Sequence, residues 1–265
     1  MKKLGFLIPI LLFIGLSTLL PQMFAAGGGA NKGTLLLIIA LFCFMAFSFR
    51  PKQKASAPAR DVEETVRGDF AKDAFADDPQ RNAKFLSALS DYSKNLPKSA
   101  LNKLGKLAAQ CRNDQETYVV AMATALCAIQ QQNYKEAIRQ YNKAIVLHPS
   151  VALAMEIGSC YQRQGELKKA RDSYEFALEL DSNHLEARSR IATTYVADGD
   201  YDAALDQAML VLEKEETNAS ALATAAICYG LMKDPILSKR YTQLAVGNGY
   251  SEKKITDTIS ALKKR

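Results

Sequence analysis

The sequence predicts an all-α protein, in which an N-terminal transmembrane helical hairpin precedes an α-solenoid of helix–turn–helix repeats and a C-terminal capping helix. Three observations support this prediction. Residues 1–49 contain two uncharged apolar runs, residues 118–250 repeat a pattern of small and aromatic side chains, and residues 251–265 form one amphipathic segment. The chain is therefore expected to contain a membrane region and one helical array.

The two apolar runs, about residues 4–24 and 33–49, are each near the length of about 17–25 residues that a helix needs to cross a bilayer. Lys2 and Lys3 precede the first run, and Arg50 and further basic residues follow the second. Because cytoplasmic flanks are rich in Lys and Arg, both ends are expected in the cytoplasm. The sequence thus predicts a multi-pass protein of a cell membrane, with a short Gly-rich loop between its spans and its repeats in the cytoplasm.

A cleaved secretory signal is the alternative for the first run, because it has a basic start, an apolar stretch and Ala25–Ala26 near its end. Met23 and Phe24 are larger than the residues that a cleavage site requires. The second run would stop transfer in either case, which would leave the repeats in the cytoplasm.

Residues 50–81 are predicted to be a linker that is first basic and then acidic. Within its acidic part, Val62, Val66 and Phe70 recur at helical spacing, which predicts a short helix with a charged, solvated face.

Residues 82–117 have apolar side chains every three to four positions on both sides of a proline break. This pattern predicts a degenerate helical hairpin that caps the array.

The repeated unit is clearest in residues 151–184. Gly158, Ala170 and Ala177 stand where two helix backbones would approach closely, and Tyr174 stands where a large side chain would fill the space between hairpins. The same offsets recur in three further units, residues 118–150, 185–218 and 219–250.

In these positions the units resemble the tetratricopeptide repeat (TPR), a helix–turn–helix unit of about 34 residues. The resemblance implies hairpins that stack side by side and bind protein partners through a concave groove.

The final segment, residues 251–265, carries a stripe of Ile255, Ile259 and Leu262. It is predicted to be a helix that covers the apolar end of the array.

Two helix starts carry a capping pattern. Asn133 is followed three residues later by Glu136, and Asn183 by Glu186. An Asn side chain at this place accepts a hydrogen bond from a free backbone N–H of the first turn. Asn133 and Asn183 are therefore predicted to be N-caps.

Positions two, five, nine and twelve of each first helix are expected to face the concave groove. The predicted groove residues of the first repeat are apolar: Val119, Met122, Leu126 and Ile129. Those of the next two repeats are Met155, Ser159 and Gln162, and Ser189 and Thr193, with Arg163 and Arg190 beside them. Such a groove could accept an amphipathic helix or an extended apolar segment of a partner. The alternative, which we prefer for the first repeat, is that the preceding hairpin covers its four side chains as core.

Catalysis is not expected. The only histidines, His148 and His184, lie in turns between repeats, and no nucleophile or Gly-rich phosphate loop accompanies them. Cysteines with the spacing of a metal or redox site are also missing from the sequence. The net charge of +6 is spread over helices that carry both signs, which is unlike a nucleic-acid-binding face. The sequence thus predicts no enzyme activity, cofactor, metal, nucleic acid or small-molecule substrate.

Cys127, Cys160 and Cys228 fall at the same position of their repeats. We interpret this position as a small buried one and expect reduced thiols.

Three function classes agree with these features. The first is a membrane-tethered scaffold that gathers cytoplasmic proteins. The second is an assembly or quality-control factor whose transmembrane hairpin itself binds a membrane partner. The third is an extracytoplasmic envelope protein, which requires that the second span fails to insert.

Overall fold

The computed structural model describes residues 74–264. The predicted spans, residues 4–24 and 33–49, and the linker up to Asp73 lie outside the described residues. Among the helices of residues 74–264, none is both long and apolar enough to cross a bilayer.

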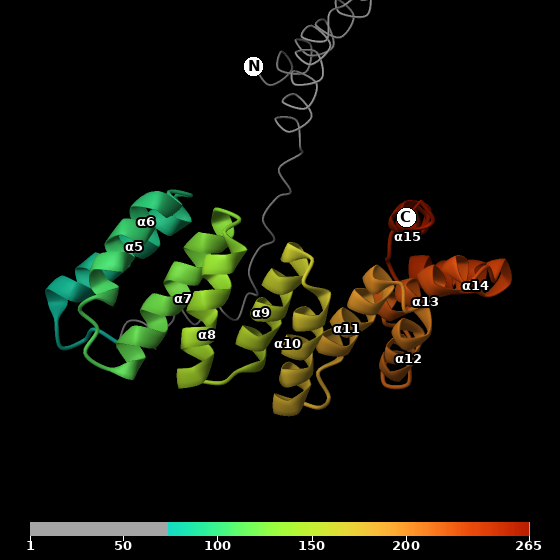
Figure 1. The fold of residues 1–265 in the computed structure, drawn as a ribbon, viewed down its shortest axis with the longest axis horizontal. Helices are drawn as coiled ribbons and strands as arrows, with labels where there is room; N and C mark the ends of the chain where they lie inside the picture. Colours follow the sequence, from blue (N-terminus) through green and yellow to red (C-terminus); the bar gives the residue numbers. More distant parts are fainter. Residues whose placement is uncertain (1–73, 265) are drawn as a thin grey trace, which may run out of the picture. The chain divides into compact units, whose positions relative to one another are not determined.

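Helices are the only regular secondary structure of the described residues, and they follow one another as hairpins (Figure 1). Their bounds are α5 (Pro79–Ser93) and α6 (Pro97–Ala108), α7 (Asp114–Gln130) and α8 (Tyr134–Leu147), α9 (Val151–Gln164) and α10 (Leu167–Leu180), α11 (Leu185–Asp198) and α12 (Tyr201–Leu212), α13 (Ala219–Leu231) and α14 (Pro235–Gly247), and α15 (Glu252–Leu262). Each hairpin packs against the next one in the chain. The prediction of an all-α solenoid of helical hairpins is therefore confirmed.

The second repeat shows why small and aromatic residues alternate in this fold. Tyr174 of α10 is fully buried, and its ring lies against the backbone of Gly158 in α9. A Cβ atom at Gly158 would stand 2.4 Å from Cε1 of that ring, so α9 and α10 pack this closely only because Gly158 has no side chain. Ala170 and Ala177 of α10 are also fully buried. The hairpin of α9 and α10 thus supplies both the small residues and the large aromatic side chain that pack between its two helices.

The predicted N-caps have different outcomes. The side chain of Asn133 accepts a hydrogen bond from the backbone N–H of Glu136, as expected. Asn183 is not a cap, because its own N–H donates to Oδ1 of Asp181 within the turn. His184 caps α11 instead, and its Nδ1 accepts from the N–H of Ala187 at 3.1 Å. The prediction for Asn183 was wrong by one residue, since an imidazole nitrogen can perform the same role.

A buried ion pair joins the first hairpin to α7. Arg81 of α5 is 5% exposed, and it donates to both carboxylate oxygens of Glu116, which is fully buried. The same guanidinium donates to the carbonyl of Gln110 at 2.8 Å and lies over the ring of Phe75. The N–H of Arg112 supplies a further donor to Glu116. Nε of Arg81 is buried without a hydrogen-bond partner among the described residues, but each charge has its counter-ion and further polar contacts, so the pair can remain ionised in the core.

Three repeat cysteines are buried, as predicted. Cys127, Cys160 and Cys228 are each at most 2% exposed, and burial raises the pKa of each thiol to about 12. We expect these thiols to resist alkylation at pH 8 in the folded protein, because the thiolate is the reactive form. Half-buried Cys111 should be modified before them. Mass spectrometry of the alkylated chain, with and without denaturant, checks this order. Alkylation of folded Cys160 as fast as Cys111 would contradict it.

Candidate partner-binding surface

The apolar residues of the first repeat are core. Val119, Met122, Leu126 and Ile129, here called the first stripe, are between 0% and 3% exposed. They belong to one core cluster with Phe85 of α5 and Leu104 and Leu107 of α6. The prediction that these four side chains line the groove is therefore wrong, because side chains without accessible surface cannot contact a partner. The first stripe is left out of the candidate surface.

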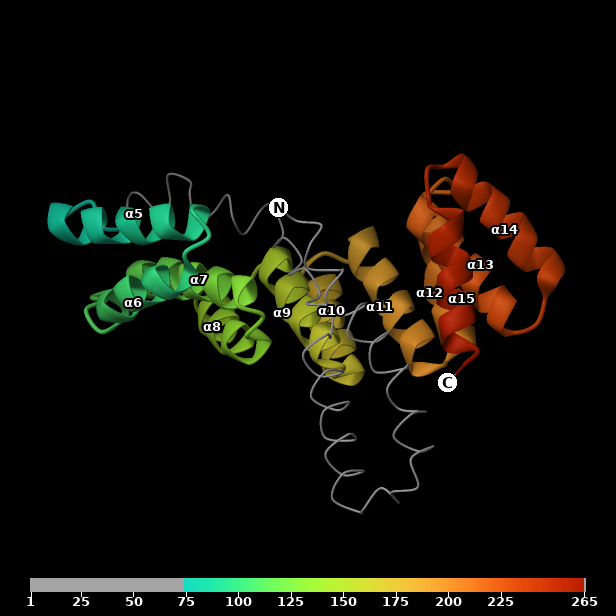
Figure 2. The same ribbon diagram turned by 90° about the horizontal axis from the view of Figure 1, so that it is seen from above.

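Most of the corresponding residues of the fourth repeat are also covered. Ala223, Ile227 and Gly230, the last stripe, lie on α13, and α15 packs across this helix (Figure 2). A Cβ atom at Gly230 would stand 2.6 Å from Cδ1 of Ile259 in α15, and Ile255 of α15 shares a core cluster with Ala223 and Ile227. The C-terminal helix therefore closes this end of the array.

Between these two ends, α9 and α11 keep accessible side chains at the predicted positions. Met155, Ser159, Gln162 and Arg163 on α9 are half-buried, and on α11 Thr193 is half-buried and Arg190 exposed. We call these six residues the central stripe. Ser189, which was also predicted to contribute, is only 8% exposed. The central stripe is thus the accessible part of the predicted groove.

Neighbouring aromatic side chains position the polar groups on α9. The hydroxyl of Tyr174 donates to Oε1 of Gln162 at 3.1 Å. This bond fixes the amide and leaves its NH₂ group free to donate to a bound segment. Arg163 lies over the ring of Tyr134 in the preceding repeat, at 5.9 Å from its centroid. Its Nε is buried without a partner among the described residues.

On α11 the polar groups are held by local bonds. Arg190 pairs with Glu186 one helical turn earlier, at 3.0 Å, and both side chains are largely exposed. Such a surface pair contributes little stability, so Arg190 can change partner at small cost. The hydroxyl of Thr193 donates to the carbonyl of Arg190, which leaves the oxygen lone pairs as acceptors.

Thr193 also borders a cleft that the sequence did not predict. The cleft has a volume of about 350 Å³ and is lined by residues of α11, α13 and α15, which include Val196, Ile227 and Leu262. Its walls combine apolar side chains with the hydroxyl-bearing residues Thr193, Ser220, Thr224, Tyr250 and Thr258. The cleft exists because α15 packs back on α13, and helical periodicity does not encode that packing direction. The central stripe therefore ends at a small cleft with both apolar and hydroxyl-bearing side chains.

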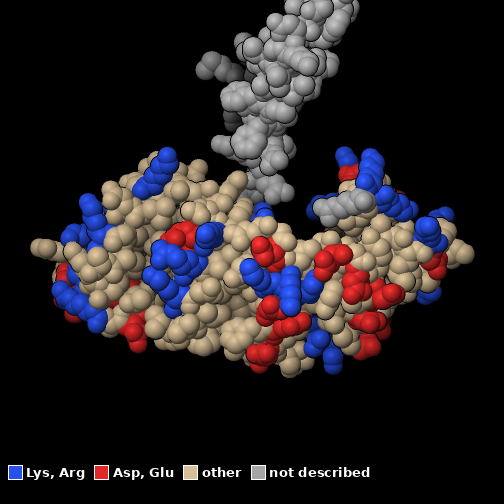
Figure 3. Space-filling view, in the orientation of Figure 1, with Lys and Arg blue, Asp and Glu red and all other residues tan. Residues whose placement is uncertain are grey.

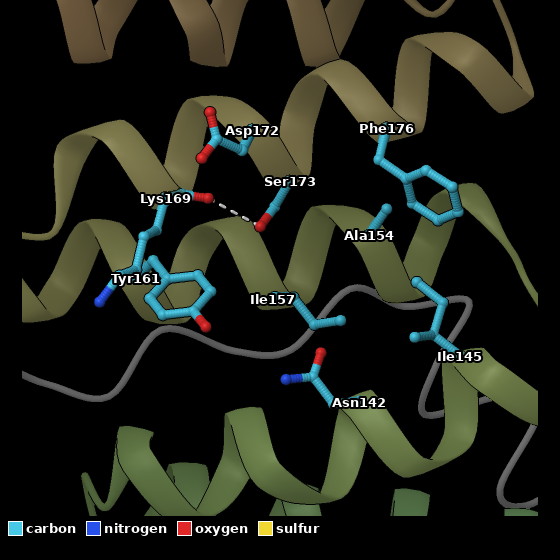
Figure 4. Close-up of a pocket in the computed structure, with 9 residues that line it drawn as sticks. All are labelled: Asn142, Ile145, Ala154, Ile157, Tyr161, Lys169, Asp172, Ser173 and Phe176. Carbon is cyan, nitrogen blue, oxygen red and sulfur yellow. Dashed lines mark hydrogen bonds between the residues drawn. The ribbon is translucent and has the colours of Figure 1, made fainter.

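A second hollow lies between α8 and α10, with α9 as its floor (Figure 4). Its volume is about 330 Å³, and Phe176 stands at its edge with 36% of its surface exposed. The hydroxyl of Ser173 donates to the carbonyl of Lys169, so this polar group is already used within α10. A Phe between Glu175 and Ala177 in α10 is the only sequence signal of this hollow.

Within residues 74–264, no group of three His, Cys, Asp or Glu side chains could hold a metal ion. On the face drawn in Figure 3, Lys and Arg are interspersed with Asp and Glu along the array.

Comparison with known proteins supports the description of the fold. A family model described as tetratricopeptide repeat matches residues 122–183 and 155–221. No curated protein matches the sequence. Among solved structures, the chain is similar to a tetratricopeptide repeat protein from Parabacteroides merdae, with 18% identity, 69% of this chain and 72% of that chain covered, and a TM-score of 0.61.

Two further similar structures are YrrB, described as a TPR protein with an unusual peptide-binding site, and MamA. YrrB shares 21% identity over 75% of this chain and 99% of its own, with a TM-score of 0.55. MamA shares 18% identity over 64% of this chain and 96% of its own, with a TM-score of 0.53. At these identities the likeness concerns the fold. The described residues thus form a TPR-like helical solenoid, a fold that suggests protein–protein interaction.

Proposed function

We propose that this TPR-like chain is a non-enzymatic scaffold that binds a peptide segment of a protein partner along the central stripe. We further propose that residues 4–24 and 33–49 hold it in a membrane, with the repeats in the cytoplasm. One observation carries the binding proposal: the predicted inner positions are largely buried at both ends of the array, whereas Met155, Ser159 and Gln162 on α9 and Thr193 on α11 keep accessible surface.

The chemistry of the central stripe indicates what kind of segment would bind. Gln162 and Arg163 supply donors, the oxygen of Thr193 accepts, and Met155 offers a flexible apolar contact. An extended backbone presents carbonyl and N–H groups that match these donors and acceptors. One apolar side chain of that segment would fit the cleft that Thr193 borders. The peptide-binding site named for YrrB supports this proposal, because it shows the same fold in such a role.

We expect Thr193→Arg to lower partner capture at least about tenfold, since a long charged side chain would fill the mouth of the cleft. Affinity capture of the full-length protein in mild detergent, followed by quantitative mass spectrometry, measures this loss. Lys168→Glu is the matched control, because Lys168 is exposed and lies on the second helix of its repeat. The proposal fails if Thr193→Arg captures partners as well as the unchanged protein while its circular dichroism is native.

The two membrane-linked functions predict different results when both apolar runs are exchanged for an unrelated transmembrane hairpin. A scaffold needs only an anchor, so its set of partners should be unchanged. An assembly factor uses its own spans as a binding surface. Loss of partners from a chain that still reaches the membrane would therefore favour the assembly factor. Protease access to the C-terminus in intact cells would instead identify an extracytoplasmic protein.

A further inference from the structure

A groove between α13, α14 and α15, here called the end groove, has a volume of about 560 Å³ (Figure 2). In the three preceding repeats, the second helix packs against the first helix of the next repeat: α8 on α9, α10 on α11 and α12 on α13. α15 follows α14 in the chain, but it packs mainly on α13. It therefore leaves most of the stacking face of α14 uncovered, and this face forms one wall of the end groove.

The stacking face of α14 differs from that of the preceding repeat. In α12 this face consists of three residues that share core clusters with residues of α13: Leu205, Ala208 and Leu212. The corresponding residues of α14 are Lys239, Thr242 and Val246. A hairpin that stacked on α14 would have to bury the charge of Lys239, which is costly without a counter-ion. The end groove is therefore unsuited to an apolar hairpin from a second copy of this chain.

The end groove carries an excess of positive charge. Lys233, Lys239 and Lys263 line it, all three are exposed, and none of them forms an ion pair within residues 74–264. Glu252 is the one acidic residue among the described residues of the lining. The surrounding sequence, residues 233–265, contains eight Lys or Arg and three Asp or Glu. Figure 3 shows Lys and Arg side chains gathered over α15 at this end. The resulting field attracts negatively charged groups.

The hydroxyl groups of the lining already donate hydrogen bonds within the protein. The hydroxyl of Ser238 donates to the carbonyl of Ala226, and the hydroxyl of Thr242 donates to the carbonyl of Ser238. Thr256 likewise donates within α15. The side-chain donors that remain for a ligand are therefore the three ammonium groups and the amide of Gln243. Such a set favours a ligand that carries negatively charged acceptors.

We propose that the end groove binds an acidic segment of a protein partner, whose Asp or Glu carboxylates pair with Lys233, Lys239 and Lys263. A hollow between helices suits a peptide segment better than the surface of a bilayer, because its lining surrounds the ligand. The end groove is separate from the central stripe. Thr258 and Leu262 of α15 line the cleft beside Thr193, whereas another face of α15 lines the end groove. The proposal thus does not rest on binding along α9 and α11.

Fluorescence anisotropy tests the proposal with a short labelled peptide of alternating Glu and Ala and the full-length protein in mild detergent. Lys239→Glu together with Lys263→Glu should weaken binding at least about tenfold, because the new carboxylates repel the peptide. The matched control, Lys253→Glu together with Lys264→Glu, changes the net charge equally at exposed residues outside the lining. It should weaken binding less than about threefold, since water and salt screen these charges.

Three results of the anisotropy experiment would overturn the proposal. The first is an equal loss of affinity in the two double variants. The second is equal binding of a peptide that has Gln in place of Glu. The third is absence of binding of the Glu peptide to the unchanged protein.

Carbodiimide coupling locates the bound peptide in the unchanged protein, so the result does not depend on how a variant folds. The reagent joins carboxylates of the peptide to nearby ammonium groups, and mass spectrometry identifies the coupled lysines. Coupling at Lys233, Lys239 and Lys263 should exceed coupling at exposed Lys168 and Lys214 at least about tenfold. Coupling of equal yield at all five would contradict the proposal. Displacement of the peptide by micelles that contain phosphatidylserine would assign the end groove to an anionic membrane and overturn the choice of a protein partner.

Discussion

Replacing Glu116 by alanine is expected to lower the free energy of unfolding by about 3–5 kcal/mol, because it leaves the buried guanidinium of Arg81 without its counter-ion. Denaturant unfolding followed by circular dichroism measures the loss. The first hairpin should separate before the other repeats, since a stacked array unfolds in units held by nearest-neighbour contacts. Hydrogen exchange of α5 and α6 identifies that region.

The matched control is the ion pair of Asp91 and Lys103, which joins α5 to α6 nearer the surface. Asp91→Ala should lower stability far less than Glu116→Ala, because water screens charges that it can reach. The double variant Arg81→Met with Glu116→Leu should recover much of the loss, since it removes both buried charges together. Equal effects of Glu116→Ala and Asp91→Ala would contradict this account.

The same buried ion pair predicts a dependence on pH. Desolvation opposes ionisation of Glu116, but the bonds from Arg81 and the N–H of Arg112 prevail and hold the pKa of its carboxyl below the ordinary 4.5. A carboxyl whose pKa is lower in the folded than in the unfolded protein stabilises the folded state at pH values above its unfolded pKa. This contribution is lost as the pH falls through the pKa of the carboxyl in the folded state. The packing of the first hairpin, α5 and α6, against α7 should therefore weaken below about pH 4.5. Hydrogen exchange of α5 at about pH 6 and about pH 3.5 checks this, with Glu116→Gln expected to remove most of the difference.

Gly158→Ala is the second change with a large expected effect. The new methyl group would meet the fully buried ring of Tyr174, at 2.4 Å from its Cε1. Overpacking of this kind costs about 1–3 kcal/mol. Because α9 carries part of the central stripe and packs against α10 at this point, partner capture should also weaken. Thermal unfolding and capture of the same preparation measure both effects.

Gly105→Ala is expected to have the opposite effect on stability from Gly158→Ala. Gly105 lies inside α6 and is exposed, and a Cβ atom there would meet nothing within 4 Å. Alanine should stabilise that helix by about 0.5–1 kcal/mol, because glycine loses more backbone entropy on folding. If Gly158→Ala and Gly105→Ala shifted the melting temperature in the same direction, the close approach of α9 and α10 would not explain the effect of Gly158→Ala.

The sequence was sufficient to predict the hairpin stack, because its signals are local and repeated. Ala170, Tyr174 and Ala177 stand at offsets that recur along the array, and each is fully buried. Helix ends were predicted less well. The pattern at Asn183 favoured an Asn cap, whereas His184 performs that role through a ring nitrogen.

The candidate surface could be predicted only in part. Spacing placed Met155, Gln162 and Thr193 on the inner face, and they keep accessible surface. Spacing alone left open whether the first stripe is groove or core, because an apolar stripe fits both. The cleft beside Thr193 depends on where α15 packs, which is a tertiary contact between residues far apart in the sequence. The partner of Glu116 could not be predicted for the same reason.

The central claim is that partners contact the stripe on α9 and α11. Photo-crosslinking tests it most directly, with a photoreactive residue placed singly at Gln162, Thr193, Lys168 or Glu213 in the full-length protein. The account predicts partner adducts from positions 162 and 193 and none from 168 and 213, which are exposed on other surfaces. Adducts of equal yield from all four positions, or from 168 and 213 alone, would contradict it.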